Sequence, residues 1–479
     1  MRKSRIICTI GPATDDVEMI RKLIDSGMDI ARLNFSHGTH EEHAARIENI
    51  RRAVAGAGAY TGILLDTKGP EIRTGKIEGG SVSLRKGQTY EITTDGSAGD
   101  DRHCSVTYKG LPKCMKEGDD ILIDDGLIEM TVLETGADRI VCRVENDGEL
   151  GSRKGVNVPG TKTDLPAMNE NDKSDLLFGI EHGVDFYAIS FVRTPKDVVD
   201  VRTFLRKNGE EHPFLIAKIE SREALRHIGD IIDVSDGVMV ARGDLGVEIP
   251  VEQVPAIQKD IIRECNKKGK SVITATQMLE SMIHNPRPTR AEAGDISNAI
   301  LDGTDAIMLS GETAMGEYPL EAVKMMSVIA EAAEEQMPRR DAVMSRVDFR
   351  ITTNAVAAAA YQASESLDTR AIVCPTTSGH TALTIAGYRP ETPIIGISRH
   401  DEILRRLSIC WGTVPVKAHT KDGMAEDDDS EDIFEYAVRT VLEAGIAEEG
   451  QRIIILAGLP KYLRNNTNTM RIHIIGEPL

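Results

Sequence analysis

Apolar runs and helical segments alternate through the first 70 residues of the chain. Residues 6–10 (IICTI) form a short apolar run that ends at a Gly-Pro dipeptide, and residues 15–27 then place apolar side chains at helical spacing. Residues 30–36 and 62–67 are two further apolar runs of strand length. This alternation is typical of β/α units, in which parallel strands form a sheet and helices cover it.

The pattern changes between residues 70 and 160. Short alternating segments such as residues 81–96 (SVSLRKGQTYEITTDG) and 139–148 (RIVCRVENDG) are separated by turn signals about every ten residues. We predict a small β-barrel domain over residues 70–160, inserted in the loop that follows the third predicted strand.

The β/α pattern resumes after residue 160 and continues to about residue 340. Five more strands bring the total to eight, each followed by a helical pattern, which is the count of a (β/α)8 TIM barrel rather than an open sheet. The predicted strands lie at residues 6–10, 30–36, 62–67, 186–192, 214–220, 237–244, 271–278 and 306–313. The predicted barrel domain therefore comprises residues 1–69 and 161–340.

A third region follows the Pro338-Arg339-Arg340 break. Helical segments alternate there with apolar runs, which predicts a doubly wound α/β domain over residues 341–479. The predicted strands of this domain lie at residues 371–376, 394–398, 452–458 and 470–476. The fold class is thus α/β throughout, with a β-rich insert.

Composition narrows the possible partners. The 479 residues carry a formal net charge of −19, which argues against nucleic acid or an anionic membrane, because either partner favours a basic face. No apolar stretch approaches the roughly 20 residues of a membrane-spanning helix. The seven cysteines are scattered without a CxxC pair, as expected for reduced thiols. We therefore expect a cytoplasmic protein.

Two neighbouring predicted strands each end in charged residues. The apolar run 214–217 is followed by Lys218 and Glu220, and the run 238–240 is followed by Asp244. Burying a lysine beside two carboxylates is unfavourable unless the groups pair or hold a metal. A functional site explains this pattern, and a structural ion pair at a strand end is the alternative, since such pairs also perturb pKa values.

Further polar side chains lie where other predicted barrel strands end. They are Arg32, Asn34 and Ser36 on the second strand, Asp66 and Thr67 on the third, Thr276 on the seventh, and Ser310 and Glu312 on the eighth. Active sites of such barrels lie at the C-terminal ends of the strands, so we expect one mouth to hold all of these residues.

The candidate residues suit anionic oxygen chemistry. Glu220 and Asp244 offer the oxygen ligands that Mg²⁺, or Mn²⁺ in its place, accepts in proteins. Lys218 beside that metal, together with Arg32 and Arg73, makes a clamp for charge that develops on phosphate or enolate oxygens. The chain has neither a Walker A sequence nor the protein-kinase signature set, so metal and side chains would hold any nucleotide phosphates.

Two short patterns do not support other sites. HGTHEEH places His37, His40 and His43 three residues apart, but HEEH is one residue short of the HExxH zinc motif. We interpret these histidines as a cluster at a helix entry. GAGAYTG at residues 56–62 precedes a strand, whereas a dinucleotide-binding fingerprint follows one.

Several long motifs resemble the pyruvate kinase family. They are ARLNFSHG (31–38), LLDTKGPEIRTG (64–75), KGVNVPG (154–160), AKIES (217–221), MVARGDLGVEIP (239–250), ATQMLESMIHNPRPTRAE (275–292) and LDGTDAIMLSGETAMGEYPLEAV (301–323). The resemblance covers the barrel closely and the C-terminal region more loosely. It implies transfer of a phosphoryl group from phosphoenolpyruvate to ADP, which gives ATP and pyruvate.

The resemblance also implies a role for each candidate. Lys218 would stabilise the phosphoryl group in flight, Glu220 and Asp244 would hold Mg²⁺, and Gly243 with Thr276 would bind the substrate carboxylate. Thr276 and Ser310 would lie on the path that protonates the enolate. The implied phosphoryl and nucleotide contacts are Arg32, Arg73, Asn34, Phe35, Ser36, His37 and Lys154. Asp124 and Asp125 would reach inward from the insert, which would act as a lid. Met315 departs from the lysine that many relatives carry there.

A K⁺ ion is implied at Asn34, Ser36, Asp66 and the Thr67 carbonyl, which offer only oxygen atoms. Relatives that work without K⁺ carry lysine where Glu71 stands in this chain, so we expect K⁺ dependence here. The alternative for Glu71 is a simple ion pair with an arginine at the hinge of the lid.

Residues 376–381 (TTSGHT) predict a phosphate site in the C-terminal domain. Hydroxyls and backbone amides between a strand and a helix form a natural phosphate nest, and an ordinary helix cap is the alternative. The predicted effector contacts are Thr376, Thr377, Ser378, Gly379, His380 and Thr381. Relatives often carry arginine where His380 stands, so we expect a monophosphate such as AMP, or a hexose or pentose phosphate, rather than a bisphosphate. The resemblance further implies a homotetramer.

Two rival functions remain open on the sequence. A metal-dependent aldolase or lyase barrel would also use Mg²⁺, a carboxylate pair and an enolate pocket. A sugar-phosphate sensor that has lost catalysis would usually show a broken Lys218, Glu220 or Asp244, and this chain keeps all three.

Overall fold

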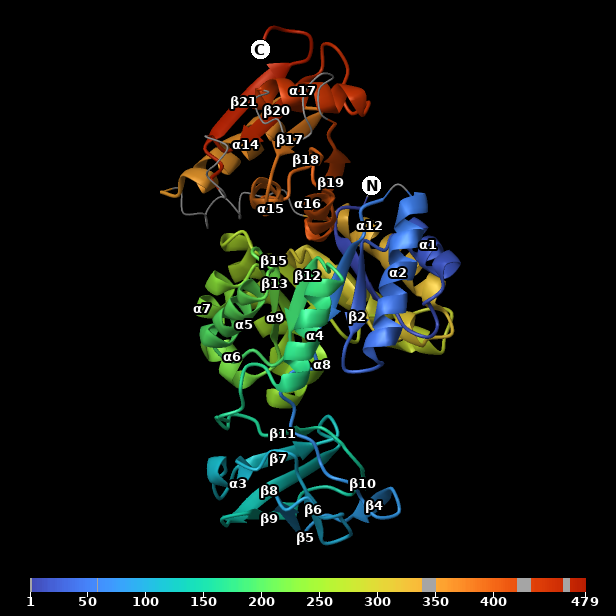
Figure 1. Ribbon diagram of the computed structural model, residues 1–479, viewed down its shortest axis with the longest axis vertical. Helices are drawn as coiled ribbons and strands as arrows, with labels where there is room; N and C mark the ends of the chain where they lie inside the picture. The colour runs from blue at the N-terminus through green and yellow to red at the C-terminus, as the bar shows by residue number, and fades with distance from the viewer. Residues whose placement is uncertain (1, 58, 338–349, 420–431, 460–465) are drawn as a thin grey trace.

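The computed structural model describes residues 2–57, 59–337, 350–419, 432–459 and 466–479. Three bodies follow one another along its longest axis, with the C-terminal α/β region at one end, a barrel in the middle and the β-rich insert at the other end (Figure 1). The predicted break at residues 338–340 lies outside the described residues.

Eight parallel strands close into a barrel in the order β1-β16-β15-β14-β13-β12-β3-β2. The strands are β1 (Arg5–Thr9), β2 (Ile30–Asn34), β3 (Gly62–Asp66), β12 (Phe186–Ile189), β13 (Leu215–Ile219), β14 (Gly237–Ala241), β15 (Ser271–Ala275) and β16 (Ala306–Leu309). They are buried almost from end to end, as expected for parallel strands with apolar side chains on both faces. The prediction of a (β/α)8 barrel is confirmed.

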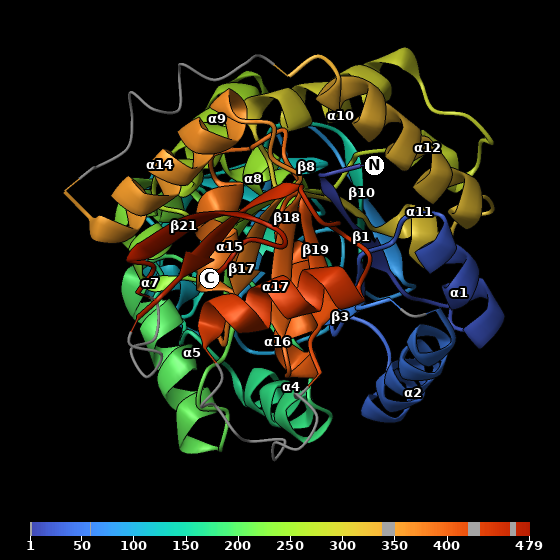
Figure 2. The same cartoon turned by 90° about the horizontal axis from the view of Figure 1, so that it is seen from above.

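Helices surround the barrel (Figure 2). They are α1 (Val17–Asp25), α2 (His40–Ala57), α4 (Glu170–Glu181), α5 (Pro195–Lys207), α6 (Arg222–Arg226), α7 (Ile228–Val234), α8 (Arg242–Glu248), α9 (Val254–Lys267), α10 (Arg290–Asp302), α11 (Gly311–Ala314) and α12 (Pro319–Glu334), with 3-10 turns at Val251–Gln253 and Glu280–Ile283. Local sequence fixes several of their ends. Thr289, for example, caps α10 through a reciprocal pair with Glu292, in which each side chain accepts from the other residue's backbone N–H.

The insert is built from short strands and one helical turn, α3 (Leu111–Cys114). Its strands are β4 (Ser81–Leu84), β5 (Thr89–Thr93), β6 (His103–Ser105), β7 (Asp120–Ile123), β8 (Ile128–Thr135), β9 (Arg139–Val144), β10 (Gly148–Gly151) and β11 (Val156–Asn157). They form a six-stranded sheet, β11-β7-β8-β9-β5-β6, and a separate two-stranded sheet, β10-β4. The predicted small β-barrel is therefore found as an open six-stranded sheet and a separate pair of strands, since the edge strands β11 and β6 have only two and three residues and do not pair with each other.

The C-terminal region holds a five-stranded sheet in the order β19-β18-β17-β20-β21, in which β21 is antiparallel to β20. Its elements are α14 (Thr352–Ser366), β17 (Ala371–Pro375), α15 (His380–Ala386), β18 (Ile394–Ser398), α16 (Asp401–Arg406), a 3-10 turn (Leu407–Ile409), β19 (Thr413–Lys417), α17 (Ile433–Glu443), β20 (Arg452–Ala457) and β21 (Thr469–Ile474). The doubly wound prediction is confirmed, although α16 and β19 were missed. Pro415 makes β19 a poor strand by sequence, and its position at the sheet edge resolves this, since an edge strand needs fewer N–H donors.

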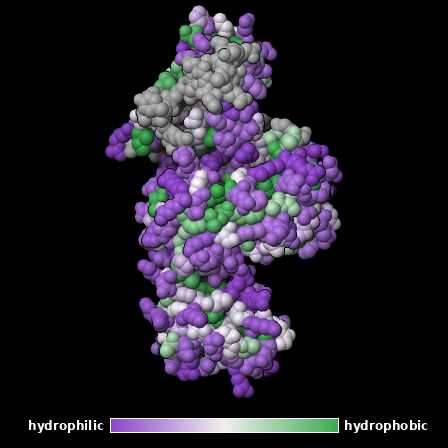
Figure 3. All heavy atoms as spheres, viewed as in Figure 1, coloured by the Kyte–Doolittle hydropathy of each residue, from purple (hydrophilic) through white to green (hydrophobic). Residues whose placement is uncertain are grey.

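The C-terminal region covers the N-terminal ends of the barrel strands. The core inside the barrel is apolar at this end, and Ile409 from the C-terminal region is part of it. Seen from above, the C-terminal sheet lies over the barrel within the ring of helices (Figure 2). The face shown in Figure 3 is mostly hydrophilic, with apolar residues in small groups rather than in one broad patch.

Among the described residues, no helix is both long and apolar enough to cross a membrane. All seven cysteines are free thiols, and six of them are buried.

Candidate active site

The inner face of the barrel changes from apolar to polar over two residues of a strand. Side chains two residues apart share a face of a strand, and on four barrel strands an inner apolar residue is followed two positions later by a polar one. The pairs are Ile30 and Arg32, Leu64 and Asp66, Ala188 and Ser190, and Ile216 and Lys218. The four polar side chains therefore meet inside the barrel at its C-terminal mouth.

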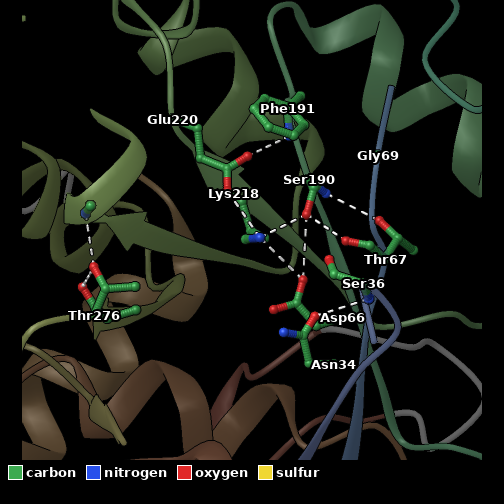
Figure 4. A network of polar contacts seen from close by, with 12 residues as sticks. Asn34, Ser36, Asp66, Thr67, Gly69, Ser190, Phe191, Lys218, Glu220 and Thr276 are labelled. Atoms are coloured by element: carbon green, nitrogen blue, oxygen red, sulfur yellow. Dashed lines mark hydrogen bonds and ion pairs between the residues drawn. The ribbon is translucent and has the colours of Figure 1, made fainter. Parts of the chain in front are cut away.

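Lys218 is the centre of this group. Its side chain is only 12% exposed, and Nζ lies 2.9 Å from Glu220 Oε1 and 3.2 Å from Asp66 Oδ1. It also donates a hydrogen bond to Ser190 Oγ at 2.7 Å (Figure 4). Burial disfavours the ammonium, but the Asp66 and Glu220 carboxylates outweigh it and raise the pKa of Lys218 above its ordinary value. Lys218 is thus held charged and fixed in place.

Asp66 is compensated on both of its oxygens. It is fully buried, Oδ2 lies 2.7 Å from the Arg32 guanidinium, and Oδ1 faces Lys218. Burial raises its pKa, but the two cations more than offset this and lower the pKa below its ordinary value. Arg32 also donates to Thr9 Oγ1 at 2.8 Å, which fixes the guanidinium inside the mouth.

Glu220 and Asp244 carry negative charge that the chain compensates less completely. Burial raises the pKa of Glu220 to about 7 in spite of the neighbouring Lys218, and burial also raises the pKa of Asp244, with Asp125, Asp66 and Glu71 adding to the effect. Glu220 is further held by the Phe191 backbone N–H, which donates to Oε2 at 2.5 Å. A cation bound between such carboxylates would offset this unfavourable charge.

The donor set fits Mg²⁺. In the described part of the chain, no three His, Cys, Asp or Glu side chains converge on one metal position. Glu220 and Asp244 would therefore share the ion with water and substrate oxygens, which is how Mg²⁺ is commonly bound in phosphate-handling sites.

Ser190 and Phe191 were missed by sequence reasoning. Ser190 Oγ donates to the Thr67 carbonyl at 2.6 Å and accepts from Lys218, so this hydroxyl joins the third and fifth strands (Figure 4). Phe191 has a φ of +55°, a left-handed conformation that aims its N–H at Glu220. The position of Ser190 just past the end of β12, the one barrel strand between the third and fifth, was the signal that could have found it.

Asn34, Ser36 and Thr67 lie beside Asp66 (Figure 4). Asn34 Oδ1 accepts from the Ser36 backbone N–H at 3.1 Å, and the Thr67 carbonyl accepts from Ser190. The structure thus brings together the four residues considered for K⁺. Because Asp66 already pairs with Lys218 and Arg32, a cation would have to share its carboxylate with those two side chains.

Gly243 and Thr276 meet on the neighbouring strand ends. The Gly243 N–H donates to Thr276 Oγ1 at 2.8 Å, and Thr276 has a φ of +67°, a strained value for a β-branched residue. Arg242 supports this loop from behind, because it pairs with Asp295 at 2.5 Å and donates to the Thr276 carbonyl at 2.5 Å.

Ser310 follows β16 and has a buried hydroxyl without a hydrogen-bond partner among the described residues. Its backbone N–H donates to Glu312 Oε2 at 2.7 Å, and Glu312 Oε1 accepts from the Leu279 N–H at 3.0 Å. Glu312 therefore links the ends of the seventh and eighth strands, while the Ser310 hydroxyl stays available for another partner.

A cavity of about 310 Å³ separates the mouth from the insert. Asp244 and Phe191 line it from the barrel, and Arg73, Lys154 and Asp125 line it from the insert. This size suits a small ligand. Two ion pairs shape the insert side, where Glu71 lies 2.6 Å from Arg73 and Lys154 lies 2.9 Å from Asp124.

Of the predicted nucleotide contacts, Arg73 and Lys154 line this cavity, whereas Asn34, Phe35, Ser36 and His37 do not. The Phe35 side chain is buried and stacks on His43 with ring centroids 4.0 Å apart, so it serves packing. His37 is exposed and accepts through its carbonyl from His43, and His40 pairs with Asp175 at 2.7 Å. The three histidines therefore make helix-entry contacts, as interpreted from the sequence.

The predicted effector residues lie between β17 and α15, in the C-terminal region. Thr376 Oγ1 accepts from the Gly379 N–H at 2.8 Å and from the Ser378 N–H at 3.3 Å. Thr381 is buried and bonds Thr467 through its hydroxyl at 2.8 Å. The Thr376 hydroxyl therefore already accepts from two of the amides expected to form a phosphate nest, while Thr377 is exposed and Ser378 and His380 are half-buried.

The fold and the mouth define an enzyme of the (β/α)8 class whose fixed lysine and carboxylates suit phosphoryl or enolate chemistry. Residues 1–323 match the family model described as the pyruvate kinase barrel domain, and residues 354–473 match that of the pyruvate kinase alpha/beta domain. The chain belongs to the pyruvate kinase family, whose members are phosphotransferases.

Relatives extend the match over the whole chain. It is 47% identical to a pyruvate kinase from Bacillus licheniformis and 46% identical to one from Geobacillus stearothermophilus, in each case over 100% of this chain and 81% of the relative. A crystal structure of a pyruvate kinase from Cryptosporidium parvum superposes with a TM-score of 0.92 at 41% identity, covering 99% of this chain and 96% of that one.

Proposed function

We propose that the chain transfers the phosphoryl group of phosphoenolpyruvate to ADP, releasing ATP and, once the enolate has taken up a proton, pyruvate. The observation that carries this proposal is the Lys218 ammonium, held between Asp66 and Glu220 at a mouth that opens on the 310 Å³ cavity. A cation fixed before the reaction costs no reorganisation as charge develops on the transferring group.

Each end of the substrate has a suitable partner in the mouth. The Gly243 N–H and the Thr276 hydroxyl would bind the carboxylate of phosphoenolpyruvate, and Arg32 would contact the phosphoryl oxygens. Glu220 and Asp244 would hold Mg²⁺, which neutralises phosphoryl charge when bound. Proximity of these groups to one another, enforced by the closed barrel, supplies the alignment that the reaction needs.

The nucleotide would enter from the side of the insert. Arg73 and Lys154 line the cavity there, and both are positively charged groups suited to ADP phosphates. Residues 70–160 would act as a lid that closes over the nucleotide and excludes water. Asn34 and Ser36, which lie beside Asp66 at the mouth, would contact the nucleotide from the barrel side.

Proton delivery to the enolate requires a group near the end of the barrel. The Ser310 hydroxyl is buried and makes no hydrogen bond to any of the described residues. Thr276 follows the adjacent strand, β15. A serine or threonine hydroxyl is too weak an acid to act alone, so we assign the pair to a path that includes water.

K⁺ would bind at Asn34, Ser36, Asp66 and the Thr67 carbonyl, where it adds positive charge near the phosphoryl group. The positions of Asn34, Ser36 and Thr67 beside Asp66 support the assignment (Figure 4). Glu71 and Arg73 both line the cavity and lie 2.6 Å apart, so the ion pair considered as the alternative role of Glu71 is present beside the proposed site.

Regulation is assigned to the C-terminal region. Residues 376–381 would bind a phosphorylated effector, and a homotetramer would allow that binding to affect distant barrels. Seven free thiols are in keeping with a cytoplasmic protein, where ADP and phosphoenolpyruvate would be encountered.

A coupled assay of pyruvate release tests the main proposal. We expect release from phosphoenolpyruvate that requires both ADP and Mg²⁺. Release that does not depend on ADP would instead favour a phosphatase or lyase. Tight binding of phosphoenolpyruvate without turnover would indicate a sensor.

A further inference from the structure

A group of packed rings lies behind the turn that follows β2. The Phe35 ring is 8% exposed and stacks on His43 with ring centroids 4.0 Å apart, and it meets Phe178 edge-on at 5.5 Å. Phe178 stacks in turn on His182 at 3.9 Å, and His40 lies against Phe178 at 4.7 Å. We call these five side chains the ring cluster. It gives a structural place to two of the histidines of the HGTHEEH segment.

The ring cluster joins three elements that are separate in the sequence. Phe35 follows β2, His40 and His43 belong to the start of α2, and Phe178 and His182 lie at the end of α4. The two helices are neighbours on the outside of the barrel (Figure 2). Stacked and edge-on ring pairs attract beyond the area that they bury. The cluster therefore fixes the Phe35 ring against both helices.

Phe35 lies between two of the proposed K⁺ ligands. Asn34 and Ser36 flank it in the sequence and lie beside Asp66 at the mouth (Figure 4). The Phe35 backbone N–H donates to the Asp66 carbonyl at 3.0 Å, while its ring packs into the cluster. The same residue is therefore tied to β3 through its backbone and to α2 and α4 through its side chain.

The turn at residues 34–38 is closed by further hydrogen bonds. The Ser36 N–H donates to Asn34 Oδ1 at 3.1 Å, and the His37 N–H donates to the Asn34 carbonyl at 3.2 Å. His43 Nε2 donates to the His37 carbonyl at 2.9 Å. The turn ends at Gly38, whose φ of +85° is a left-handed value that glycine adopts without strain. His43 thus contacts the turn through a ring nitrogen as well as through its ring face.

His43 is a neutral ring. A carbonyl only accepts hydrogen bonds, so Nε2 carries the proton, and Nδ1 is buried without a hydrogen-bond partner among the described residues. A second proton on Nδ1 would find no acceptor there, and burial lowers the pKa of His43 to about 4. The ring that supports the turn therefore adds no positive charge that would repel a cation.

We propose that Phe35 and His43 are positioning residues for the monovalent cation: through the turn at residues 34–38, they hold Asn34 and Ser36 in the orientation that binds K⁺. This rests on the K⁺ site proposed above. Ligand atoms keep their geometry only when packing fixes the residues that carry them. Loss of such support commonly weakens metal binding about 10–100-fold.

Thermal unfolding of the full chain measures K⁺ binding without turnover. Ligand that binds the folded state raises the melting temperature once its concentration exceeds the dissociation constant. K⁺ should be titrated at constant ionic strength, with tetramethylammonium chloride as the replacement salt. We expect Phe35→Leu to raise the K⁺ concentration at which stabilisation begins at least tenfold. In the coupled assay, the K⁺ concentration for half-maximal activity should rise by a similar factor, which should exceed the fall in kcat.

Two substitutions of His43 test the stack itself and serve if Phe35→Leu does not fold. His43→Ala removes the ring, and we expect both K⁺ concentrations to rise at least fivefold. His43→Phe keeps a flat ring against Phe35 and should stay within threefold of wild type. If His43→Phe is as impaired as His43→Ala, the stack does not position the turn and the proposed role of the rings is wrong.

Phe214→Leu is the matched control. Phe214 is likewise 8% exposed and pairs with another ring, that of Phe186 at 5.1 Å, but it belongs to the apolar core at the other end of the barrel. We expect it to lower the melting temperature in K⁺-free buffer about as much as Phe35→Leu does. Its K⁺ concentrations should stay within twofold of wild type.

The outcomes separate the ring cluster from the cation site. If Phe35→Leu and His43→Ala lower the melting temperature as Phe214→Leu does, with K⁺ concentrations within twofold of wild type, the rings serve packing alone, contrary to the proposal. If K⁺ neither stabilises nor activates wild type, the K⁺ site and the role of the rings are both wrong. Pyruvate release that still requires ADP would then leave the phosphoryl-transfer proposal standing.

Discussion

Charge is buried at both ends of this barrel, but with different partners. At the mouth, Lys218 forms ion pairs with both Asp66 and Glu220. Burial still raises the pKa of Glu220 to about 7. At the base, Asp305 accepts from Arg389 at 2.5 Å and from the Val272 backbone N–H at 2.8 Å, so each carboxylate oxygen has a partner. The Arg389 guanidinium in turn donates to the Gly303 carbonyl at 2.6 Å and stacks over Trp411.

The comparison indicates which charges serve stability and which serve chemistry. At the base, the Asp305 and Arg389 side chains are buried where the C-terminal region meets the barrel, so each gains from the opposite charge of the other. The mouth faces a cavity, and its excess carboxylate charge is useful only when a metal and substrate arrive. In barrels of this class, the C-terminal ends of the strands carry function and the N-terminal ends carry stability.

Lys218→Met should give the largest change in activity. We expect kcat for pyruvate release to fall at least about a thousandfold, because the ammonium acts mainly in the transition state. Circular dichroism should stay native, since Asp66 keeps Arg32 as a partner. Exchange of the pyruvate methyl protons can persist in this variant, because that step does not need phosphoryl transfer. Near-normal turnover with ADP would show that Lys218 has been misassigned.

Arg389→Met should instead affect stability. It leaves Asp305 buried without its cation, which we expect to lower the free energy of unfolding by about 3–5 kcal/mol. Turnover well below the melting temperature should change little. Arg263→Met is the matched control, because Arg263 pairs with Asp260 on the surface and such pairs contribute less than about 1 kcal/mol. Equal losses in the two variants would contradict the contrast between the base and the surface.

Glu71→Lys tests whether the mouth lacks positive charge. Wild type should be activated more than tenfold when K⁺ is added to buffer free of Na⁺ and K⁺ with Mg²⁺ saturating, whereas Glu71→Lys should respond little. The variant also breaks the ion pair with Arg73, so Glu78→Lys, at an exposed position of the insert, controls for added charge. Full wild-type activity without K⁺ would overturn the K⁺ assignment.

Ser190→Ala should have the smallest effect of the four. It removes the hydroxyl between Lys218 and the Thr67 carbonyl, and we expect kcat to fall about tenfold, the equivalent of one hydrogen bond of about 1.4 kcal/mol. The K⁺ concentration for half-maximal activity should rise, because Thr67 is one of the proposed K⁺ ligands. Ser235→Ala removes a buried hydroxyl elsewhere in the barrel and serves as the control. A fall in stability with unchanged K⁺ dependence would assign Ser190 to packing alone.

The alternation of apolar runs and helical segments was enough to predict the barrel, its insert and the C-terminal sheet. It also placed Lys218, Glu220, Asp66 and Thr276 at one mouth, because the carboxyl ends of parallel strands lie at the same edge. These features follow from short-range periodicity and from the rule that consecutive β/α units pair in order. A sequence carries both kinds of information directly.

The tertiary structure decided the rest. Ser190 reached Lys218 and Thr67 only when β3, β12 and β13 closed side by side. The two sheets of the insert, the edge strand β19 and the contact of the Phe35 ring with Phe178 likewise depended on neighbours distant in the chain. The ion pair between Asp305 and Arg389 joins residues 84 positions apart in different domains. Such contacts are fixed by how surfaces meet in space, and local pattern does not encode which surfaces meet.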